Sequence, residues 1–158
     1  MSGNGSPGSE VAGFTGKRVV IVASSWHTTV MDGLIAGATR VVEASGLTPE
    51  IHRVPGTFEL SIAAREAALA GADVVIALGV VIRGGTPHFD FVCNAATDGL
   101  NRVALDTGVP IGFGVLTCDD EQQALDRAGL PTSKEDKGAE AAAAAMNTWV
   151  VLRNIRKS

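Results

Sequence analysis

Four short apolar runs alternate along the chain with longer segments in which apolar residues recur every three or four positions. The runs cover residues 18–24, 50–54, 73–81 and 110–117, and the first and third are continuous and rich in β-branched residues. Such continuous runs are typical of strands that are covered on both faces. Helical spacing predicts helices over residues 30–46 and 57–70, after Pro87, over 119–128, and from about Ser133 to the C-terminus. Asp119, followed three residues later by Gln122, predicts the N-terminal cap of the fourth helix.

This order of strands and helices predicts an α/β fold. Helices should cover both faces of a four-stranded parallel sheet, which gives a three-layer α/β/α sandwich with right-handed crossovers. Ligands of such sheets bind beyond the carboxyl ends of the strands. We therefore expect the functional residues in the segments that follow Ser24, Val54, Ile82 and Thr117.

The composition fits a single globular domain. With 158 residues, of which 46% are hydrophobic and 19% charged, the chain can bury a core without disulfides. Its mean hydropathy is +0.22, and no apolar run reaches the ~20 residues of a membrane helix, which excludes a membrane protein. A net charge of −4 without a basic stripe argues against binding to nucleic acid.

The cysteines and the first residues bear on the cellular compartment. Cys93 and Cys118 stand far apart and outside any Cys-x-x-Cys pair, so we expect reduced thiols rather than a zinc site or a disulfide. Residues 1–16 are rich in Gly and Ser and lack a basic region followed by an apolar one. We expect a flexible tail rather than a signal peptide, and a cytoplasmic protein.

The ends of the first two strands contain candidate ligand-binding residues. Trp26 follows the first strand, where its ring could stack on a planar ligand, although a core aromatic would have the same sequence signature. The segment from Pro55 to Glu59 follows the second strand and opens a helix, whose first backbone N–H groups are free to bind acceptors. Glu59 is equally explained as a first-turn acid that the helix dipole favours.

The segment from Arg83 to His88, after the third strand, has the clearest functional signature. Its sequence is RGGTPH, and the two glycines let the backbone approach a ligand while the following helix directs N–H groups toward an anion. Thr86 adds a hydroxyl donor, and His88 is placed to transfer protons. The glycine spacing fits neither a dinucleotide fingerprint nor a Walker loop, so we predict a site for a small phosphate ester. No second His or Cys lies at metal-ligand spacing from His88, so we expect no metal.

Three further residues carry little signal on their own. Phe113 lies inside the fourth predicted strand, where core burial is the ordinary explanation. Arg127 and Lys137 are each explained as solvated surface charges.

Taken in order, however, the motifs resemble one known family. The segment from Ala77 to Cys93, ALGVVIRGGTPHFDFVC, is followed at matching intervals by RAG at 127–129 and DKG at 136–138. This arrangement is similar to the lumazine synthases of riboflavin biosynthesis over residues 17–156. The resemblance implies a flavodoxin-like fold, with residues 17–158 as a single domain after a tail over residues 1–16.

The resemblance implies a transferase that needs neither a cofactor nor a metal. Its two small-molecule substrates would be 5-amino-6-(D-ribitylamino)uracil and 3,4-dihydroxy-2-butanone 4-phosphate. Their condensation gives 6,7-dimethyl-8-ribityllumazine with release of phosphate and water, the penultimate step of riboflavin biosynthesis. The substrate supplies the amine nucleophile and the leaving group is phosphate, which agrees with a chain that lacks a recognisable nucleophile motif.

The resemblance also implies a role for each matching position. His88 would be the proton donor, and the phosphate would contact Gly85, Thr86 and Arg127. The pyrimidine and its ribityl chain would contact Trp26, Thr57, Phe58, Glu59, Val80, Val81, Ile82, Lys137 and, from an adjoining subunit, Phe113. Two positions depart from the family pattern. Gly85 replaces a residue that is often Gln or Ala, which removes a side-chain contact, and Thr57 replaces a common Ala, which adds a hydroxyl.

Finally, the resemblance implies a homopentamer with active sites between neighbouring subunits. A decamer or a sixty-subunit shell are the alternatives, but the turn over residues 129–138 is two residues longer than in shell-forming relatives and contains Pro131, which favours the free pentamer. Two other functions stay open, a non-catalytic flavin- or lumazine-binding protein and a protein whose main role is to form a shell. The presence of His88, Arg127 and Lys137 together argues against a pure binder.

Overall fold

The computed structural model describes residues 5 and 7–158, and its four parallel strands form one sheet in the order β2-β1-β3-β4. The strands are β1 (Val19–Ser24), β2 (Glu50–Val54), β3 (Val74–Ile82) and β4 (Ile111–Cys118). Each lies within one residue of its predicted range, and the order is that of flavodoxin-like sheets. The predicted parallel sheet is therefore confirmed.

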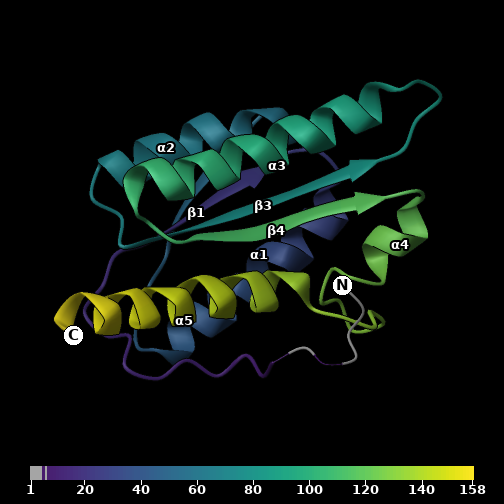
Figure 1. The fold of residues 1–158 in the computed structure, drawn as a ribbon. Helices are drawn as coiled ribbons and strands as arrows, with labels where there is room; N and C mark the ends of the chain where they lie inside the picture. The colour runs from purple at the N-terminus through teal and green to yellow at the C-terminus, as the bar shows by residue number, and fades with distance from the viewer. Residues whose placement is uncertain (1–4, 6) are drawn as a thin grey trace.

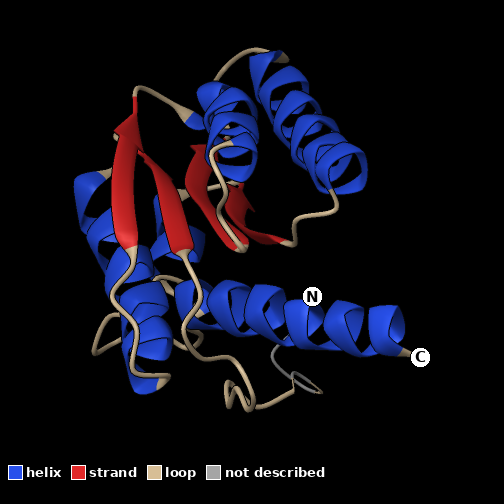
Figure 2. Cartoon of the chain, turned by 90° about the vertical axis from the view of Figure 1, so that its left-hand side faces the viewer, coloured by secondary structure: helices blue, strands red, loops and turns tan. Residues whose placement is uncertain are grey.

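Helices cover both faces of this sheet, as Figures 1 and 2 show. Helices α1 (Thr28–Ala44) and α5 (Lys137–Lys157) pack together on one face, and α2 (Leu60–Leu69) and α3 (His88–Thr107) pack together on the other. A short helix, α4 (Glu121–Leu125), follows β4. The three-layer sandwich is confirmed.

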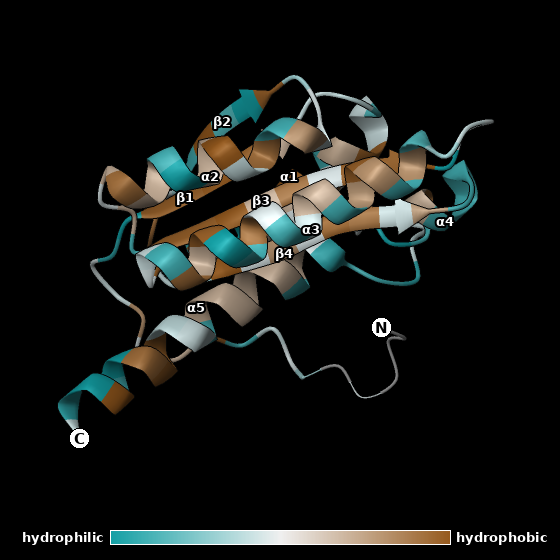
Figure 3. Ribbon diagram, turned by 45° about the horizontal axis from the view of Figure 1, so that its top comes forward, coloured by the Kyte–Doolittle hydropathy of each residue, from teal (hydrophilic) through white to brown (hydrophobic). Residues whose placement is uncertain are grey.

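The core consists of two apolar layers, one on each side of the sheet. Alternate residues of β1 and β3 face opposite layers, so Ile21 and Ile76 pack with α1 and α5, while Val20 and Val75 pack with α2 and α3. Figure 3 shows the hydrophobic strands β1 and β3 between helices on whose visible faces hydrophilic and hydrophobic residues alternate. The edge strand β2 differs, because four of its five residues are exposed.

Several predicted helix boundaries differ from those of the structure. The second helix begins as a 3₁₀ turn, η1 (Thr57–Glu59), before α2. The cap of α4 is Asp120 rather than Asp119, since the Asp120 side chain accepts from the Gln123 backbone N–H. Helix α4 ends at Leu125 and α5 begins only at Lys137, because the intervening turn satisfies its own backbone groups; the N–H groups of residues 134 and 135 both donate to the carbonyl of residue 126.

The predicted tail falls partly outside the described residues, which leave out positions 1–4 and 6. Within the described part, Phe14 is buried in the apolar core layer on the side of the sheet that α1 and α5 cover. Its ring meets Trp149 of α5 edge-on, with 5.1 Å between the centroids. This residue therefore packs against the domain rather than extending into solvent.

Candidate active site at the carboxyl edge of the sheet

The turn after β1 presents an aromatic ring to solvent. Trp26 is 68% exposed, so the alternative explanation as a core aromatic is wrong. The next residue, His27, caps α1 in the left-handed region, with φ 57° and ψ 66°, a conformation that few non-glycine residues adopt. A Cβ built on Gly56 would lie 3.8 Å from the Trp26 ring, which places this ring beside the turn that follows β2.

The turn after β2 is fixed to the end of β3 by the side chain of Thr57. This side chain is buried, and its hydroxyl donates to the Val80 carbonyl at 3.3 Å. Gly79 provides the space, because a Cβ at that position would lie 2.8 Å from the Thr57 hydroxyl. The Thr57 hydroxyl therefore anchors η1 to β3.

Glu59 and Phe58 complete this turn. Glu59 lies in the first turn of the helix, as the ordinary explanation holds, and its carboxylate also accepts from the Gly56 backbone N–H at 2.9 Å. The neighbouring Phe58 is 61% exposed. Trp26, Phe58 and Glu59 therefore lie around one turn at the carboxyl edge.

The segment after β3 is open to solvent at the start of a long helix. Val80 is buried and Val81 and Ile82 are half-buried, whereas residues 83–88 are exposed. Cβ atoms at Gly84 and Gly85 would meet nothing within 4 Å, so the backbone is accessible there. Helix α3 begins at His88 and runs for 20 residues, and its N-terminus presents unpaired N–H groups and a positive dipole beside Gly85 and Thr86. The geometry suits an anion.

Arg127 and Lys137 are joined through one carboxylate. The Arg127 Nε lies 3.8 Å from Glu135 Oε1, and the Lys137 Nζ lies 2.5 Å from Glu135 Oε2. The Lys137 Nζ also contacts Glu140 Oε2 at 2.8 Å. Only 17% of the Lys137 side chain is exposed, so its explanation as a solvated charge is wrong.

The charges of this cluster stabilise one another. The hydrogen bond from Lys137 lowers the pKa of Glu135, against the opposing effect of burial. Burial alone would lower the pKa of Lys137, but the hydrogen bonds with Glu135 and Glu140 outweigh it and raise that pKa above its ordinary value. Both groups are therefore held in their charged forms.

Arg127 also acts on the end of β4. Burial raises the pKa of the Cys118 thiol, and the positive charge of Arg127 partly opposes this shift. The Arg127 guanidinium donates to the Gln123 carbonyl at 2.9 Å, and 38% of the side chain remains exposed. It thus combines a fixed position with an accessible charge.

The predicted residues do not all meet within one chain. Trp26 and Glu59 follow β1 and β2. Arg127 and Lys137 lie in and after the turn that follows α4, and this turn packs against α1, where Gly33 faces the Ala128 carbonyl. Phe113 pairs with Ala77 in the sheet, five residues before the end of β4, or about 16 Å from the carboxyl edge. It is 47% exposed, so core burial is the wrong explanation for it.

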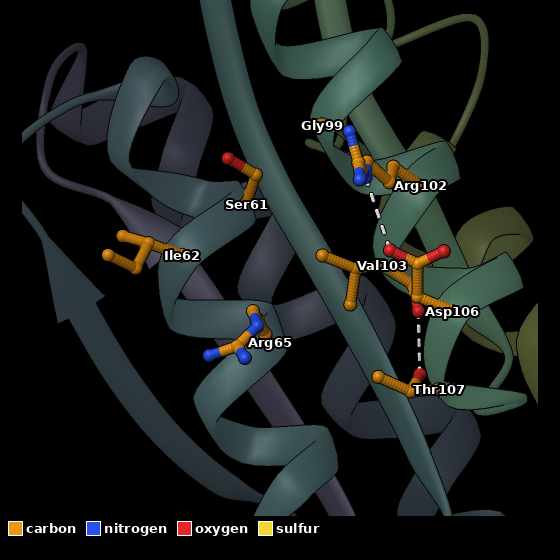
Figure 4. A pocket seen from close by; sticks show the side chains of 8 residues that line it. All are labelled: Ser61, Ile62, Arg65, Gly99, Arg102, Val103, Asp106 and Thr107. Atoms are coloured by element: carbon orange, nitrogen blue, oxygen red, sulfur yellow. Dashed lines mark hydrogen bonds and ion pairs between the residues drawn. The ribbon is translucent and has the colours of Figure 1, made fainter.

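Two grooves on the surface lie elsewhere. One of about 430 Å³ runs between α2 and α3 and is lined by Ser61, Arg65, Arg102 and Asp106 among others, as Figure 4 shows. Another of about 410 Å³ lies between the end of α3, the start of β4, and α5. Neither is lined by a predicted site residue.

Two further properties concern the described residues alone. They contain no group of three or more His, Cys, Asp or Glu side chains that could hold a metal ion. None of their helices is both long and apolar enough to cross a membrane.

Sequence reasoning missed the residues that support the site. Arg83 was only part of a motif, yet its side chain contacts Asp119, Asp90 and Phe89. Glu135 joins Arg127 to Lys137. An arginine placed directly before two exposed glycines was the one available signal for Arg83; no pattern in the sequence indicated Glu135.

The fold and this edge define a class. The chain is a flavodoxin-like α/β protein with exposed aromatic side chains and the open N-terminus of a long helix at the carboxyl ends of its strands. Comparison with known proteins specifies the family: the sequence model of 6,7-dimethyl-8-ribityllumazine synthase matches residues 16–153, and the chain belongs to this family.

Individual relatives are similar in sequence to this chain over nearly its whole length. The chain is 64% identical to the 6,7-dimethyl-8-ribityllumazine synthase of Leifsonia xyli subsp. xyli over 157 residues, covering 99% of both chains. It is 64% identical over 156 residues to the enzyme of that name from Kineococcus radiotolerans, covering 98% of this chain and 96% of the relative. The identity to the Streptomyces avermitilis protein of that name is 55% over 156 residues, covering 98% and 97%.

Proposed function

We propose that this protein condenses 5-amino-6-(D-ribitylamino)uracil with 3,4-dihydroxy-2-butanone 4-phosphate to form 6,7-dimethyl-8-ribityllumazine, phosphate and water. Membership of the family supports the reaction. In this chain, the proposed reaction is supported by the carboxyl edge of the sheet. There the exposed Trp26 ring and the open N-terminus of α3 follow neighbouring strands. One surface suits a planar pyrimidine and the other a phosphate ester.

The chemistry requires alignment and proton transfer rather than a protein nucleophile. The amine of the uracil attacks the ketone to give an imine and water, phosphate is then eliminated, and ring closure with loss of a second water gives the product. Holding two reactants close together in the reactive orientation lowers the activation barrier by up to about 7–11 kcal/mol in well-aligned systems. His88, exposed at the first position of α3, is the group proposed to move protons beside the phosphate.

The binding roles follow the layout of the edge. The ring of the uracil would stack on Trp26, with Val81 and Ile82 along its edge. Because the Thr57 side chain is used to anchor η1, its contribution would come through the backbone, with Phe58 and Glu59 beside it. The phosphate would meet Gly85 and Thr86 at the helix N-terminus, and Arg127 would supply a charge-assisted hydrogen bond.

We further propose that the site is shared between neighbouring subunits of a homopentamer. In a single chain, Phe113 lies about 16 Å back along β4 from the carboxyl edge that Trp26 and His88 follow. Four of the seven Phe and Trp residues are exposed: Trp26, Phe58, Phe91 and Phe113. Exposed aromatics on this scale mark surfaces that another molecule covers. A ring of identical subunits covers them without growing into a filament.

The longer turn over residues 129–138, with Pro131, favours the free pentamer over a larger shell. The proposed setting is the cytoplasm, and the proposed partners are the two substrates and further copies of the chain.

One assay tests the reaction against its alternatives. The purified protein is mixed with both substrates, and the absorbance of the lumazine and the release of phosphate are followed. Formation of both products in equal amounts, faster than without protein, supports the synthase. Binding of flavin or lumazine without turnover would instead support a binding protein, and assembly into a shell without turnover a structural one.

A further inference from the structure

Arg83 lies directly before the glycine loop, and its side chain reaches past that loop. Its guanidinium carbon lies 4.1 Å from the centroid of the Phe89 ring, and its Nη1 lies 3.6 Å from Asp90 Oδ1. Its Nε donates to Asp119 Oδ1 at 2.9 Å, while its backbone N–H donates to the Cys118 carbonyl at 2.9 Å. One residue thus connects the start of the loop with the first turn of α3 and with the turn after β4.

The loop has little packing of its own. Gly84 and Gly85 have open space around the positions of their missing Cβ atoms, and Thr86 is exposed. A pair of exposed glycines is conformationally free, so its ends must set the geometry in which its N–H groups meet a ligand. Arg83 connects the two ends of the loop. It precedes the loop in the chain, and its side chain contacts the Phe89 ring and the Asp90 carboxylate, which follow the loop.

The charges around Arg83 indicate that its guanidinium does not itself bind the phosphate. Its hydrogen bond with Asp119 is the largest cause of the raised pKa of its guanidinium, and the charge of Asp90 adds to it. The group therefore already faces two carboxylates. Without Arg83, both negative charges would stand uncompensated beside an anion-binding helix N-terminus, where they would repel a phosphate.

We propose that Arg83 is a positioning residue of the phosphate site, which holds the Gly84–Thr86 loop in its anion-binding form and neutralises Asp90 and Asp119. The inference rests on the proposed function, since it assumes that this loop receives the phosphate of the second substrate. Arg83 acts through the loop and the two carboxylates.

The test is the substitution Arg83→Gln, which removes the charge and keeps a planar polar group. The KM for the butanone phosphate and the inhibition constant for inorganic phosphate should each rise about tenfold, which corresponds to about 1.4 kcal/mol. The KM for the uracil should stay within about twofold, because the change lies in phosphate binding alone. Adding Asp119→Asn to Arg83→Gln should restore part of the phosphate affinity, since it removes one uncompensated carboxylate.

Arg102→Gln is the matched control. Arg102 lies in α3 and pairs with the Asp106 carboxylate at 3.2 Å, away from the glycine loop, so its loss should change neither KM. Equal rises in both KM values, or an unchanged KM for the phosphate substrate, would overturn the inference. Failure of the wild-type protein to form lumazine would instead overturn the proposed function. If Arg83→Gln does not fold, the test uses Arg83→Lys, which keeps the charge but loses the planar fork of the guanidinium. An unchanged KM for the butanone phosphate in Arg83→Lys would refute the positioning role.

Discussion

The substitution Gly138→Ala tests the packing that places Lys137 and Arg127. Gly138 is the second residue of α5 and is buried against α1. A Cβ at this position would lie 2.0 Å from the Leu34 carbonyl oxygen and 2.8 Å from the Leu34 Cα, whereas ordinary contact begins at 3.4 Å. These are backbone atoms within a helix, so no side-chain rotation can relieve the clash. The start of α5 has to move away from α1 by about 1.4 Å, the difference between 3.4 and 2.0 Å.

Two opposing effects decide the sign of the change in stability. Alanine is the better helix former by about 1 kcal/mol, which favours the variant. Overpacking typically costs about 1–3 kcal/mol, and contact with rigid backbone places this site in the upper part of that range. We therefore expect a net loss of about 1–2 kcal/mol, or a fall in Tm of about 2–8 °C for a chain of this length.

The displacement of the start of α5 should also change the position of Arg127 in the candidate site. The Lys137 backbone N–H donates to the Arg127 carbonyl at 3.0 Å, so a shift of the start of α5 moves the turn that holds Arg127. The KM for the butanone phosphate should rise more than the KM for the uracil. Thermal unfolding at matched protein concentration and steady-state kinetics measure the two effects.

A control on the same helix separates propensity from packing. Ala144 is exposed in α5, so Ala144→Gly should lower stability by about 1 kcal/mol through helix propensity alone. If Gly138→Ala unfolds at the wild-type temperature or above, the close approach of α5 to α1 does not limit this position and the reasoning is refuted.

Three further predictions concern the reaction and the assembly. Arg127→Ala should weaken the butanone phosphate by about 1.5–3 kcal/mol, the range of charge-assisted hydrogen bonds, with a much smaller effect on the uracil; calorimetric titration of each substrate measures this, and equal losses would count against a phosphate contact. His88→Ala should slow turnover by about 10²–10⁴-fold and leave a residual rate from alignment; a wild-type rate in the same absorbance assay would exclude the proton-transfer role. Light scattering should give a mass near five subunits; a mass near sixty would contradict the argument from the 129–138 turn, and a monomer would contradict the shared site.

The strands could be predicted closely from the sequence, and the helix boundaries less well, for a physical reason. A run such as residues 74–81 is apolar throughout because helices cover it on both sides. The turn over residues 126–136 has no such pattern. Its conformation depends on individual hydrogen bonds, such as those from the Ser133 hydroxyl to the Leu125 carbonyl and from the Leu130 N–H to Ser133 Oγ. Periodicity cannot reveal bonds of this kind.

The position of the candidate site could be predicted, but its supporting contacts could not. Carboxyl ends of parallel strands meet at one edge whatever the loops contain, so the segments after β1 and β3 had to lie there. The pairing of Arg83 with Asp119 joins loops that follow different strands. Asp119 also has the sequence signature of a helix cap, and the local pattern led to that wrong assignment. The separation of 36 residues between the two partners leaves no periodic signal.

Phe113 shows a deeper limit of sequence patterns. It alternates with Ile111 and Val115 on the side of the sheet that α2 and α3 cover, and both of these neighbours pack in that layer. The alternation correctly predicts that Phe113 belongs to an apolar surface, but it does not say which chain covers that surface. Because β4 is an edge strand, the helices of the same chain leave the ring half exposed. An aromatic residue that has the pattern of a core position and lies exposed on an edge strand favours burial by another molecule, which supports our proposal that Phe113 contributes to a neighbouring subunit's site.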